Sequence, residues 1–548
     1  MSYENKWKDK APAETVKGIK KFLADSNIIV KEEEVTCVGN CYAVVLLIED
    51  TNLFVNGKGS SKEFAMASAY GELMERIMTK VLFRYNYYDR YSEDKEYIFL
   101  KDEVRVDRVD YDVKKIYPLG LEQCDYEAAL NVQRYFTAYS DKLVLEPFKT
   151  LIGNKTRYFP VSVLDVAYGT NGMAFGNTLE EAKTQALSEI FERYCNKRII
   201  NEEKVMPKLS LESGIINERV RNEIYELMKK TGLDISVYDA SLGEGYPVIC
   251  VIYQNRHNNT YFVKFGAHFD INIAIERCLT EMFQGRQLEQ SKYMKKKIYL
   301  EDAVWRKKNM ESILHTGDGF YPLKVLEGKN ASYKFEPWPE FESNGEALDY
   351  YTNKLLQLNE DTFFKIYKIG DFCTVRYLVP GISQIYDDLE YKMRWQSELN
   401  TVSDLLERMP NLETNELAYC INFIKNNIKS VEDTLIPFFK HKYSYSSIYR
   451  YYNLYILYFE FYMMSNDLQS AKKIIDYYEK LATARKEIIL AMKRIVKSIE
   501  NSNDKTPIYK FALSKKLFDI ETLADKNYCQ RRKCYCSGIK ATYNKMYS

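Results

Sequence analysis

Glutamates recur at one spacing in segments of this chain that lie far apart. The stretches 56–77 and 171–194 align without a gap when Gly59 is superimposed on Gly176, and the stretch 271–286 continues the same register. The equivalent positions, one from each stretch in turn, are Ser68, Gln185 and Arg277, then Glu72, Glu189 and Glu281, then Glu75, Glu192 and Gln284. Carboxylate oxygens in this number suit Mg²⁺, which usually binds together with phosphate oxygens.

Each of these stretches predicts a helix with one polar stripe. At about 100° per residue, side chains at i, i+4 and i+7 fall within one narrow sector of the helix surface. A single stripe is typical of a solvated helix face. Three stripes with glutamate at the same spacing instead favour helices that converge on one cavity, where crowded carboxylates raise each other's pKa unless cations bind among them. We therefore expect a magnesium site, with Ser68, Gln185 and Arg277 around a nucleotide that the metal ions hold.

A strand, a turn and a helix must position each stripe. In the first unit we expect a helix over 13–25, and the apolar runs 41–50 and 53–59 predict a strand pair that leads into the striped helix. In the second unit, 158–170 predicts a strand, followed by a glycine-rich turn and a helix that begins near Asn177. The expected capping pairs are Ser60 with Glu63 and Asn177 with Glu180.

The third unit and the residues after it extend the same architecture. The runs 234–256 and 260–269 predict antiparallel strands ahead of the third helix, and 362–383 predicts two more strands. Between them, 301–346 lacks clear periodicity and is expected to form long surface connections. Strands interleaved with helices predict an α+β body.

Beyond about Asp387 nearly every segment has a helical period, with few glycines. We expect a body of repeated strand–helix units over 1–386 and an all-helical, tetratricopeptide-like domain over 387–548, although the full consensus of that repeat is not matched. The apolar run 451–464 contains Glu460 and is shorter than the roughly 20 residues that a membrane-spanning helix needs, so it predicts a buried helix.

The composition argues against several classes of function. The 78 basic residues are balanced by 77 acidic ones, and a net charge of +1 gives no support to nonspecific nucleic-acid or membrane binding. The first residues, MSYENKWKDK, lack the apolar core of a secretory signal, so a cytoplasmic location is expected. Eleven scattered cysteines predict reduced thiols. No standard zinc spacing occurs in either cysteine cluster, which are Cys37 with Cys41 and Cys529 with Cys534 and Cys536.

The striped helices and their flanking residues resemble those of a known family. The motifs SxxxExxER (68–76), QxxxExxER (185–193) and RxxxExxQ (277–284), with the runs NGKG, YPVICV and FGAH, resemble the YcaO family over roughly residues 10–385. The resemblance implies an ATP site in which helical glutamates hold Mg²⁺, and the chain indeed has no GxxxxGK[ST] phosphate loop. It implies metal ligands at Glu72, Glu75, Glu189, Glu192 and Glu281, ATP contacts from Ser68, Glu72, Glu75, Gln185, Glu189, Arg277 and Glu281, and catalytic roles for Arg277 and Glu281.

The roles of some nearby residues stay open. Arg76 and Arg193 are either structural partners of the carboxylates or substrate contacts. His268 either faces the cavity or is a hydrogen-bonded structural histidine. A lysine near the N-terminus reaches ATP in the family, but Lys8 and Lys10 both match its position poorly, so neither is assigned.

The resemblance also implies a reaction and partners. Family members use ATP to activate a backbone amide: a nucleophile adds to the carbonyl, and its oxygen takes the γ-phosphoryl group and leaves as phosphate. The flanking motifs resemble relatives that assist a RimO-type radical methylthiotransferase in β-methylthiolation of small-subunit ribosomal protein twelve, and the family implies a homodimer. Thioamide or azoline synthesis on a peptide is an alternative, disfavoured because no proline follows Pro507 in the C-terminal tail. A nucleotide-binding adaptor without amide chemistry is another.

Overall fold

The computed structural model describes most of the first 386 residues and parts of the remainder. The described ranges are 7–84 apart from 50 and 52, 97–111, 126–282 apart from 138 and 140, 294–297, 303–386, 412–427, 467–480 and 486–500, with a few isolated positions between 393 and 463.

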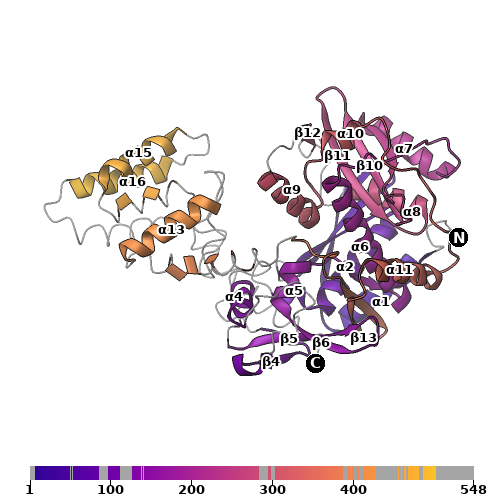
Figure 1. Ribbon diagram of the computed structural model, residues 1–548, viewed down its shortest axis with the longest axis horizontal. Coiled ribbons are helices and arrows are strands. Elements are labelled where there is room, and N and C mark those ends of the chain that lie inside the picture. Colours follow the sequence, from indigo (N-terminus) through magenta and orange to yellow (C-terminus); the bar gives the residue numbers. More distant parts are fainter. Residues whose placement is uncertain are drawn as a thin grey trace.

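Three antiparallel sheets form the framework of the body (Figure 1). The three-stranded sheet has the order β1-β2-β3, with bounds Val30–Val38, Cys41–Ile48 and Phe54–Gly59. The five-stranded sheet has the order β12-β11-β10-β9-β8, with bounds Lys295–Lys296, Thr260–Ala267, Val248–Asn255, Asp234–Asp239 and Lys208–Leu209. The six-stranded sheet has the order β4-β5-β13-β14-β7, with β6 also paired to β5, and bounds Val104–Val106, Leu143–Thr150, Phe363–Ile369, Phe372–Leu378, Met173–Gly176 and, for β6, Thr156–Pro160.

Helices cover these sheets and link them. Those of the body are α1 (Pro12–Asp25), α2 (Lys62–Met78), α3 (Val81–Arg84), α4 (Tyr126–Phe136), α5 (Val161–Tyr168), α6 (Leu179–Asn201), α7 (Glu218–Thr231), α8 (Ile271–Glu281), α9 (Ala303–Thr316), α10 (Leu323–Glu327) and α11 (Asn344–Leu358), with a 3₁₀ turn, η2, at Arg108–Asp110. Later in the chain lie α13 (Thr414–Asn427), α15 (Leu468–Glu479) and α16 (Lys486–Glu500). The largest core cluster packs α6 against β14, β10 and β11.

The three striped helices each follow a strand: α2 follows β3, α6 follows β7 and α8 follows β11. Glycines on these strands let each helix approach closely. A Cβ added to Gly57 would lie 2.2 Å from the Ala65 carbonyl oxygen, and one added to Gly266 would lie 2.5 Å from that of Ala274. In the second unit, a Cβ on Gly176 would lie 2.4 Å from the amide nitrogen of Ala182. Because the contacted alanines occupy equivalent sequence positions, the three units share one strand-to-helix packing.

The units also interlock around a ring. Besides its own strand, α2 contacts β7, α6 contacts β11 and α8 contacts β3. Each striped helix therefore packs on the strand of the next unit as well as on its own. This arrangement links α2, α6 and α8 through strand contacts, and all three helices belong to the sheet-containing part of the molecule (Figure 1).

Much of the predicted element order is confirmed. The structure contains the first helix, the strand pair before α2, the antiparallel pair β10–β11 before α8 and the pair β13–β14. The sequence-based interpretation of 158–170 as a strand is wrong, because most of that run is α5. Its apolar residues are buried on nearly all sides, and periodicity cannot distinguish such a short helix from a buried strand.

Two further predictions need correction. The helix caps lie one residue later than expected: Ser61 accepts a hydrogen bond from Phe64 N, and Thr178 accepts one from Glu181 N. Both capping residues are extended, and the neighbouring polar residues in the sequence are equally able hydrogen-bond acceptors, so sequence alone did not separate them. The range 301–346 is also more regular than expected, since it contains α9, α10 and the start of α11.

The described residues after 387 that have regular structure are helical, and α15 packs on α16. The tetratricopeptide-like repeat and the division at residue 386 stay predictions. Only isolated positions of the run 451–464 are described, and of these Phe459 and Met463 are buried. The cluster Cys529, Cys534 and Cys536 lies outside the described residues. In the described part of the chain no helix has the length and apolar character needed to cross a membrane.

Candidate functional site

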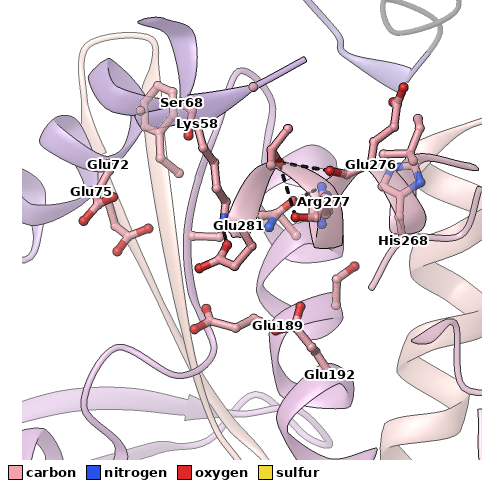
Figure 2. A pocket seen from close by; sticks show the side chains of 18 of the residues that line it. Lys58, Ser68, Glu72, Glu75, Glu189, Glu192, His268, Glu276, Arg277 and Glu281 are labelled. Atoms are coloured by element: carbon pink, nitrogen blue, oxygen red, sulfur yellow. Dashed lines mark hydrogen bonds and ion pairs between the residues drawn. The ribbon is translucent and has the colours of Figure 1, made fainter. Parts of the chain in front are cut away.

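One pocket of about 640 Å³ gathers the three polar stripes. Every predicted site residue that the structure describes lines it: Ser68, Glu72, Glu75, Gln185, Glu189, Glu192, Arg277 and Glu281, together with Arg76 and Arg193. Figure 2 shows Glu72 and Glu75 facing Glu189 and Glu192 across the space, with Lys58 and Glu281 between them. Gln284 lies outside the described residues. The stripes therefore face a common cavity rather than bulk solvent.

The pocket is elongated along α6. Glu181, near the N-terminus of α6, Glu189 in the middle and Asn196 near its end all line the cavity. At 1.5 Å per residue the 15 steps from 181 to 196 correspond to about 22 Å. The pocket thus extends along the helix, with the carboxylate cluster between its two ends.

Each carboxylate in the centre has a cationic neighbour. Arg76 lies 3.4 Å from a carboxylate oxygen of both Glu72 and Glu75. Arg193 lies 2.7 Å from Glu189. Lys58 contacts Glu281 and so joins the end of β3 to the end of α8 (Figure 2). Arg76 and Arg193 therefore pair with the carboxylates, which is the structural role that the sequence analysis left open for them.

Burial shifts the protonation equilibria of this cluster. Burial, with smaller contributions from Glu72 and Glu189, raises the pKa of Glu75 to about 8, although Arg76 opposes the change. Burial also raises the pKa of Glu192, and Lys58 acts against it. The pKa of Lys58 is lowered to about 8, again chiefly by burial. Burial thus disfavours the charged forms of both the glutamates and Lys58, and a ligand that brings complementary charges can stabilise these charged forms.

The donor set fits Mg²⁺. Among the described residues no three acidic, histidine or cysteine side chains are arranged to hold one ion as they stand, and the central carboxylates are engaged by Lys58, Arg76 and Arg193. Their chemistry is nevertheless that of a hard-cation site: several buried carboxylates, with raised pKa at Glu75 and Glu192, face one cavity. A divalent cation would replace the arginine and lysine partners.

Arg277 links two of the stripes. Its guanidinium donates to Gln185 Oε1 at 2.5 Å and to the Ala267 carbonyl oxygen at 2.6 Å. The first bond joins α8 to α6, and the second fixes the side chain at the end of β11. Burial lowers the pKa of Arg277, opposed chiefly by Glu192. A guanidinium held in this way is suited to stabilise anionic oxygen atoms.

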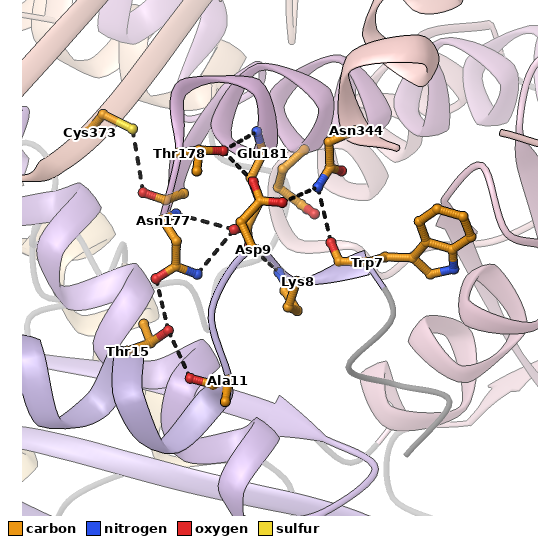
Figure 3. Close-up of polar contacts among 12 residues, drawn as sticks. Trp7, Lys8, Asp9, Ala11, Thr15, Asn177, Thr178, Glu181, Asn344 and Cys373 are labelled. Atoms are coloured by element: carbon orange, nitrogen blue, oxygen red, sulfur yellow. Dashed lines mark hydrogen bonds and ion pairs between the residues drawn. The ribbon is translucent and has the colours of Figure 1, made fainter. Parts of the chain in front are cut away.

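The N-terminal segment lines the pocket near the start of α6, and Figure 3 shows its polar contacts there. Lys8 Nζ lies 2.9 Å from Glu181, and Asp9 accepts a hydrogen bond from Thr178, the cap of α6. Asn344 Nδ2 donates to the Trp7 carbonyl oxygen at 3.1 Å. These contacts tie the segment to the N-termini of α6 and α11. Lys8 and Lys10 both line the pocket, and Lys8 is the one that pairs with a carboxylate from it.

Sequence reasoning missed several pocket residues on strands. Lys58 lies on β3 and Lys264 on β11, and neither belongs to a repeated motif. The position of Lys58, next to the aligned Gly59, was the available signal. His268 also lines the pocket and is hydrogen-bonded, since its Nδ1 accepts from Asp270 N at 2.9 Å. Burial, with Arg277 and Lys8 nearby, lowers the pKa of His268 well below its ordinary value, so this imidazole is neutral.

Comparison with known proteins places this site in a family. Residues 56–383, more than half of the chain, match the family model described as YcaO cyclodehydratase, ATP- and Mg²⁺-binding. The ribosomal protein S12 methylthiotransferase accessory factor YcaO of Escherichia coli is 29% identical over 432 residues, which cover 75% of this chain and 70% of that protein. An uncharacterized protein of Haemophilus influenzae is 29% identical over 418 residues, covering 71% and 70% of the respective chains.

Solved structures are similar at lower identity. YcaO from Methanopyrus kandleri, bound with AMPPCP and Mg²⁺, has a TM-score of 0.43 and 14% identity, with 71% of this chain and 94% of that chain covered. A heterocyclase in complex with substrate and cofactor has a TM-score of 0.46 and 17% identity, and the match spans 68% of this chain and 53% of that chain. From the extent of the family match, this chain belongs to the YcaO family of ATP- and Mg²⁺-binding enzymes that activate backbone amides.

Proposed function

We propose that this protein binds ATP with Mg²⁺ in the pocket between α2, α6 and α8 and uses the γ-phosphoryl group to activate a backbone amide. The observation that carries the proposal is the convergence of glutamates from three distant stretches on one cavity. Glu72, Glu75, Glu189, Glu192 and Glu281 would hold the metal ions. Bound Mg²⁺ would neutralise phosphate charge and orient the phosphates for transfer.

The remaining pocket residues then have distinct tasks. Ser68, Gln185 and Arg277 bind the nucleotide, and Arg277 and Glu281 lie nearest the transferred group. A nucleophile adds to the carbonyl carbon of the amide, the carbonyl oxygen then takes the γ-phosphoryl group as ADP departs, and that oxygen leaves as phosphate. Catalysis of such a transfer is mainly positioning and charge stabilisation, which the fixed guanidinium of Arg277 supplies. Arg76 and Arg193 balance the charge of the carboxylates until Mg²⁺ takes their place.

For the biological role, we propose an accessory factor in β-methylthiolation of small-subunit ribosomal protein twelve, with a RimO-type radical methylthiotransferase as partner. The support is the similarity to the E. coli accessory factor along three quarters of this chain. A homodimer in the cytoplasm is part of the same proposal and rests on the family resemblance alone.

The activity is tested by ATP hydrolysis with matched variants of α6. Glu189→Gln removes a proposed metal ligand that faces the pocket, whereas Glu180→Gln changes an exposed glutamate in the first turn of the same helix. We expect the first change to lower the hydrolysis rate about 100-fold or more, as loss of a charge-stabilising group typically does, and the second to leave it within about twofold of wild type. Equal rates in wild type and Glu189→Gln would refute the proposed site.

The role is tested by mass spectrometry of the ribosomal protein from a strain in which the gene is deleted. Loss of the methylthio group, restored by the wild-type gene but not by the Glu189→Gln variant, is the expected result. An intact methylthio group, with thioamide or azoline instead missing from another peptide, would favour the peptide-modifying alternative. Restoration by the hydrolysis-deficient variant would favour a nucleotide-binding adaptor.

A further inference from the structure

Lys58 joins the first and third units at the centre of the pocket. It lies on β3, and its side chain contacts Glu281, the last residue of α8 (Figure 2). The two side chains are 27% and 29% exposed, so the contact is largely shielded from water. Glu192 and Glu72 also attract the Lys58 ammonium. One cation from a strand of the first unit thus acts on carboxylates from all three striped helices.

The packing that the three units share does not require a lysine at this position. Counting seven residues back from the contacted alanine of each unit gives Lys58, Phe175 and Ala267, which lie at or next to the ends of β3, β7 and β11. Phe175 packs on the neighbouring striped helix, since a Cβ added to Gly71 of α2 would lie 3.3 Å from a carbon of its ring. Ala267 is buried. Two of the three units therefore place an apolar side chain here, and the charge of Lys58 serves the pocket rather than the packing.

Lys58 differs from two neighbouring cations of the pocket in the group that holds it. Lys264 Nζ donates to a backbone carbonyl oxygen just after α9 at 3.0 Å, and the Arg277 guanidinium donates to one at the end of β11 at 2.6 Å. Neither of these acceptors is a proposed metal ligand. Lys58 is instead held by Glu281, which is one. A metal ion that binds to this carboxylate must therefore displace the Lys58 ammonium.

Displacement of the ammonium is unfavourable unless it gains another anionic partner. Lys264 and Arg277 repel it, and a divalent cation would add further positive charge beside all three groups. A metal ion that binds without nucleotide therefore loses part of its attraction to Glu281. The phosphates of a nucleotide supply the missing anionic oxygens. A lysine ammonium suits this exchange, because it is a point charge on a flexible stem and binds phosphate well.

We propose that Lys58 is a counter-ion that couples the binding of Mg²⁺ to the binding of ATP. It neutralises Glu281 while the pocket is empty, and it moves to the phosphate oxygens when the metal ion and the nucleotide bind together. The exchange disfavours Mg²⁺ by itself and favours Mg²⁺ in complex with the nucleotide. This inference rests on the proposed binding of ATP and Mg²⁺ in the pocket.

The first test measures binding of a metal ion without nucleotide. Mn²⁺ is the probe, and electron paramagnetic resonance reports how much of it remains free. Lys58→Met removes the ammonium and keeps an unbranched side chain, whereas the control Lys62→Met changes an exposed lysine in the first turn of α2. We expect Lys58→Met to bind Mn²⁺ about tenfold more tightly than wild type, because no ammonium competes for Glu281. The control should stay within about twofold of wild type. Equal or weaker binding by Lys58→Met would overturn the proposal.

The second test measures binding of a non-hydrolysable ATP analogue by calorimetric titration at saturating Mg²⁺. Here Lys58→Met should bind about tenfold more weakly than wild type, because the charge-assisted contact between ammonium and phosphate is lost. Shifts of opposite sign for metal and nucleotide distinguish the exchange from a packing defect, which would weaken both. An unchanged or higher affinity for the analogue would contradict the transfer of Lys58 to phosphate.

Thermal unfolding of the variants shows whether the comparison is valid. Lys58→Met and Lys62→Met should unfold at matching temperatures. If Lys58→Met does not fold, Lys58→Gln takes its place in both titrations, since it also removes the charge and keeps a polar side chain.

The outcomes separate this inference from the proposed function. Opposite shifts in a protein that binds the analogue with Mg²⁺ but does not hydrolyse ATP would retain the coupling and overturn amide activation. Hydrolysis that Glu189→Gln abolishes, without opposite shifts in Lys58→Met, would do the reverse. Failure of wild type to bind the analogue with Mg²⁺ would overturn both.

Discussion

The molecule buries charged side chains in two places, and a glutamate in one place has a lowered pKa while a glutamate in the other has a raised pKa. Outside the pocket, a group that we call the sheet network lies on and beside the six-stranded sheet: Arg84, Glu103, Glu146, Asp165, Lys365 and Arg376. Lys365 Nζ lies 3.0 Å from Glu146, and Arg376 lies 2.7 Å from Asp165. Burial alone would raise the pKa of Glu146, but Lys365, Arg84 and Arg376 together lower it.

In the pocket, a glutamate behaves differently. The side chain of Glu75 is 13% exposed, against 1% for Glu146, and burial raises its pKa to about 8; Arg76, which lies 3.4 Å away and is shared with Glu72, offsets only part of this rise. The comparison teaches that burial alone does not determine a charge's state. In the sheet network the pKa of Glu146 is lowered because three cations act on it, whereas burial still raises the pKa of Glu103 and of Asp165. Where partners are shared and distant, as around Glu75, the site is better stabilised by a ligand that brings its own cations.

The largest effect that we expect comes from breaking the sheet network. Lys365→Met leaves the buried carboxylate of Glu146 without its nearest cation and should lower the free energy of unfolding by about 3–5 kcal/mol. The control, Lys368→Met, changes an exposed lysine on the same strand. Urea unfolding of both variants measures the difference. A loss below about 1 kcal/mol for Lys365→Met would mean that this network is no more structural than the pocket.

Removing the buried carboxyl group of Glu75 from the pocket should raise the free energy of unfolding, in contrast to the loss expected for Lys365→Met. The ordinary pKa of glutamate is 4.5, and that of Glu75 in the folded protein is about 8. Between these pH values the unfolded chain ionises at this residue while the folded protein does not, so the residue lowers stability as pH rises and its full cost is present above about pH 8. Without ATP and Mg²⁺, Glu75→Gln should therefore be more stable than wild type by a few kcal/mol at pH 8.

The same comparison should vanish in acid. Below about pH 3.5, under the ordinary pKa of 4.5, both states of wild type carry the proton, and denaturant unfolding of Glu75→Gln and wild type should give matching free energies there. A difference that does not change with pH would refute the raised pKa.

Ligand binding should stabilise the pocket and leave the sheet network unaffected. At 100 times its dissociation constant, ATP with Mg²⁺ should raise the free energy of unfolding by about 2.7 kcal/mol. Thermal unfolding of wild type and of Lys365→Met should show the same increase, whereas EDTA or Glu192→Gln should remove most of it. An equal increase in the presence of EDTA would show that the carboxylates hold no metal with the nucleotide.

The smallest expected effect concerns a charge cluster on the surface. Arg198 pairs with Glu202 at 2.6 Å and with Glu244 at 2.8 Å, and all three side chains are partly solvated. Arg198→Ala should cost less than about 1 kcal/mol of unfolding free energy, because water screens such pairs. A loss as large as that of Lys365→Met would show that short distance, rather than burial, determines how much an ion pair contributes to stability.

The sequence predicted that the three glutamate-bearing helices meet at one pocket better than it predicted the secondary structure that leads to them. The equal spacing of glutamates in three stretches predicted that the three helices line one cavity. The close approach of a strand glycine to Ala65, Ala182 and Ala274 shows that the three stretches are also structurally equivalent. The helix at 161–168 was missed because a short apolar run buried on nearly all sides carries no periodic signal.

The cationic part of the site was harder to predict. Lys58 and Lys264 reach the pocket from strands, and their importance depends on which sheet edges meet the three helices. Lys8 depends on the path of the N-terminal segment across the start of α6. Such contacts are set by tertiary packing between residues far apart in the chain, which no local pattern records. The sheet network, assembled from residues between 84 and 376, was missed for the same reason.

The interlocking of the three units has a consequence for how such a site arises. Because α2 packs on β7, α6 on β11 and α8 on β3, no unit encloses the cavity by itself. A polypeptide with one strand–helix repeat would have to assemble as a threefold oligomer to form the same chamber. Joining three copies in one chain removes that concentration dependence and lets each copy diverge, so that serine, glutamine and arginine can occupy one equivalent position at a single cavity.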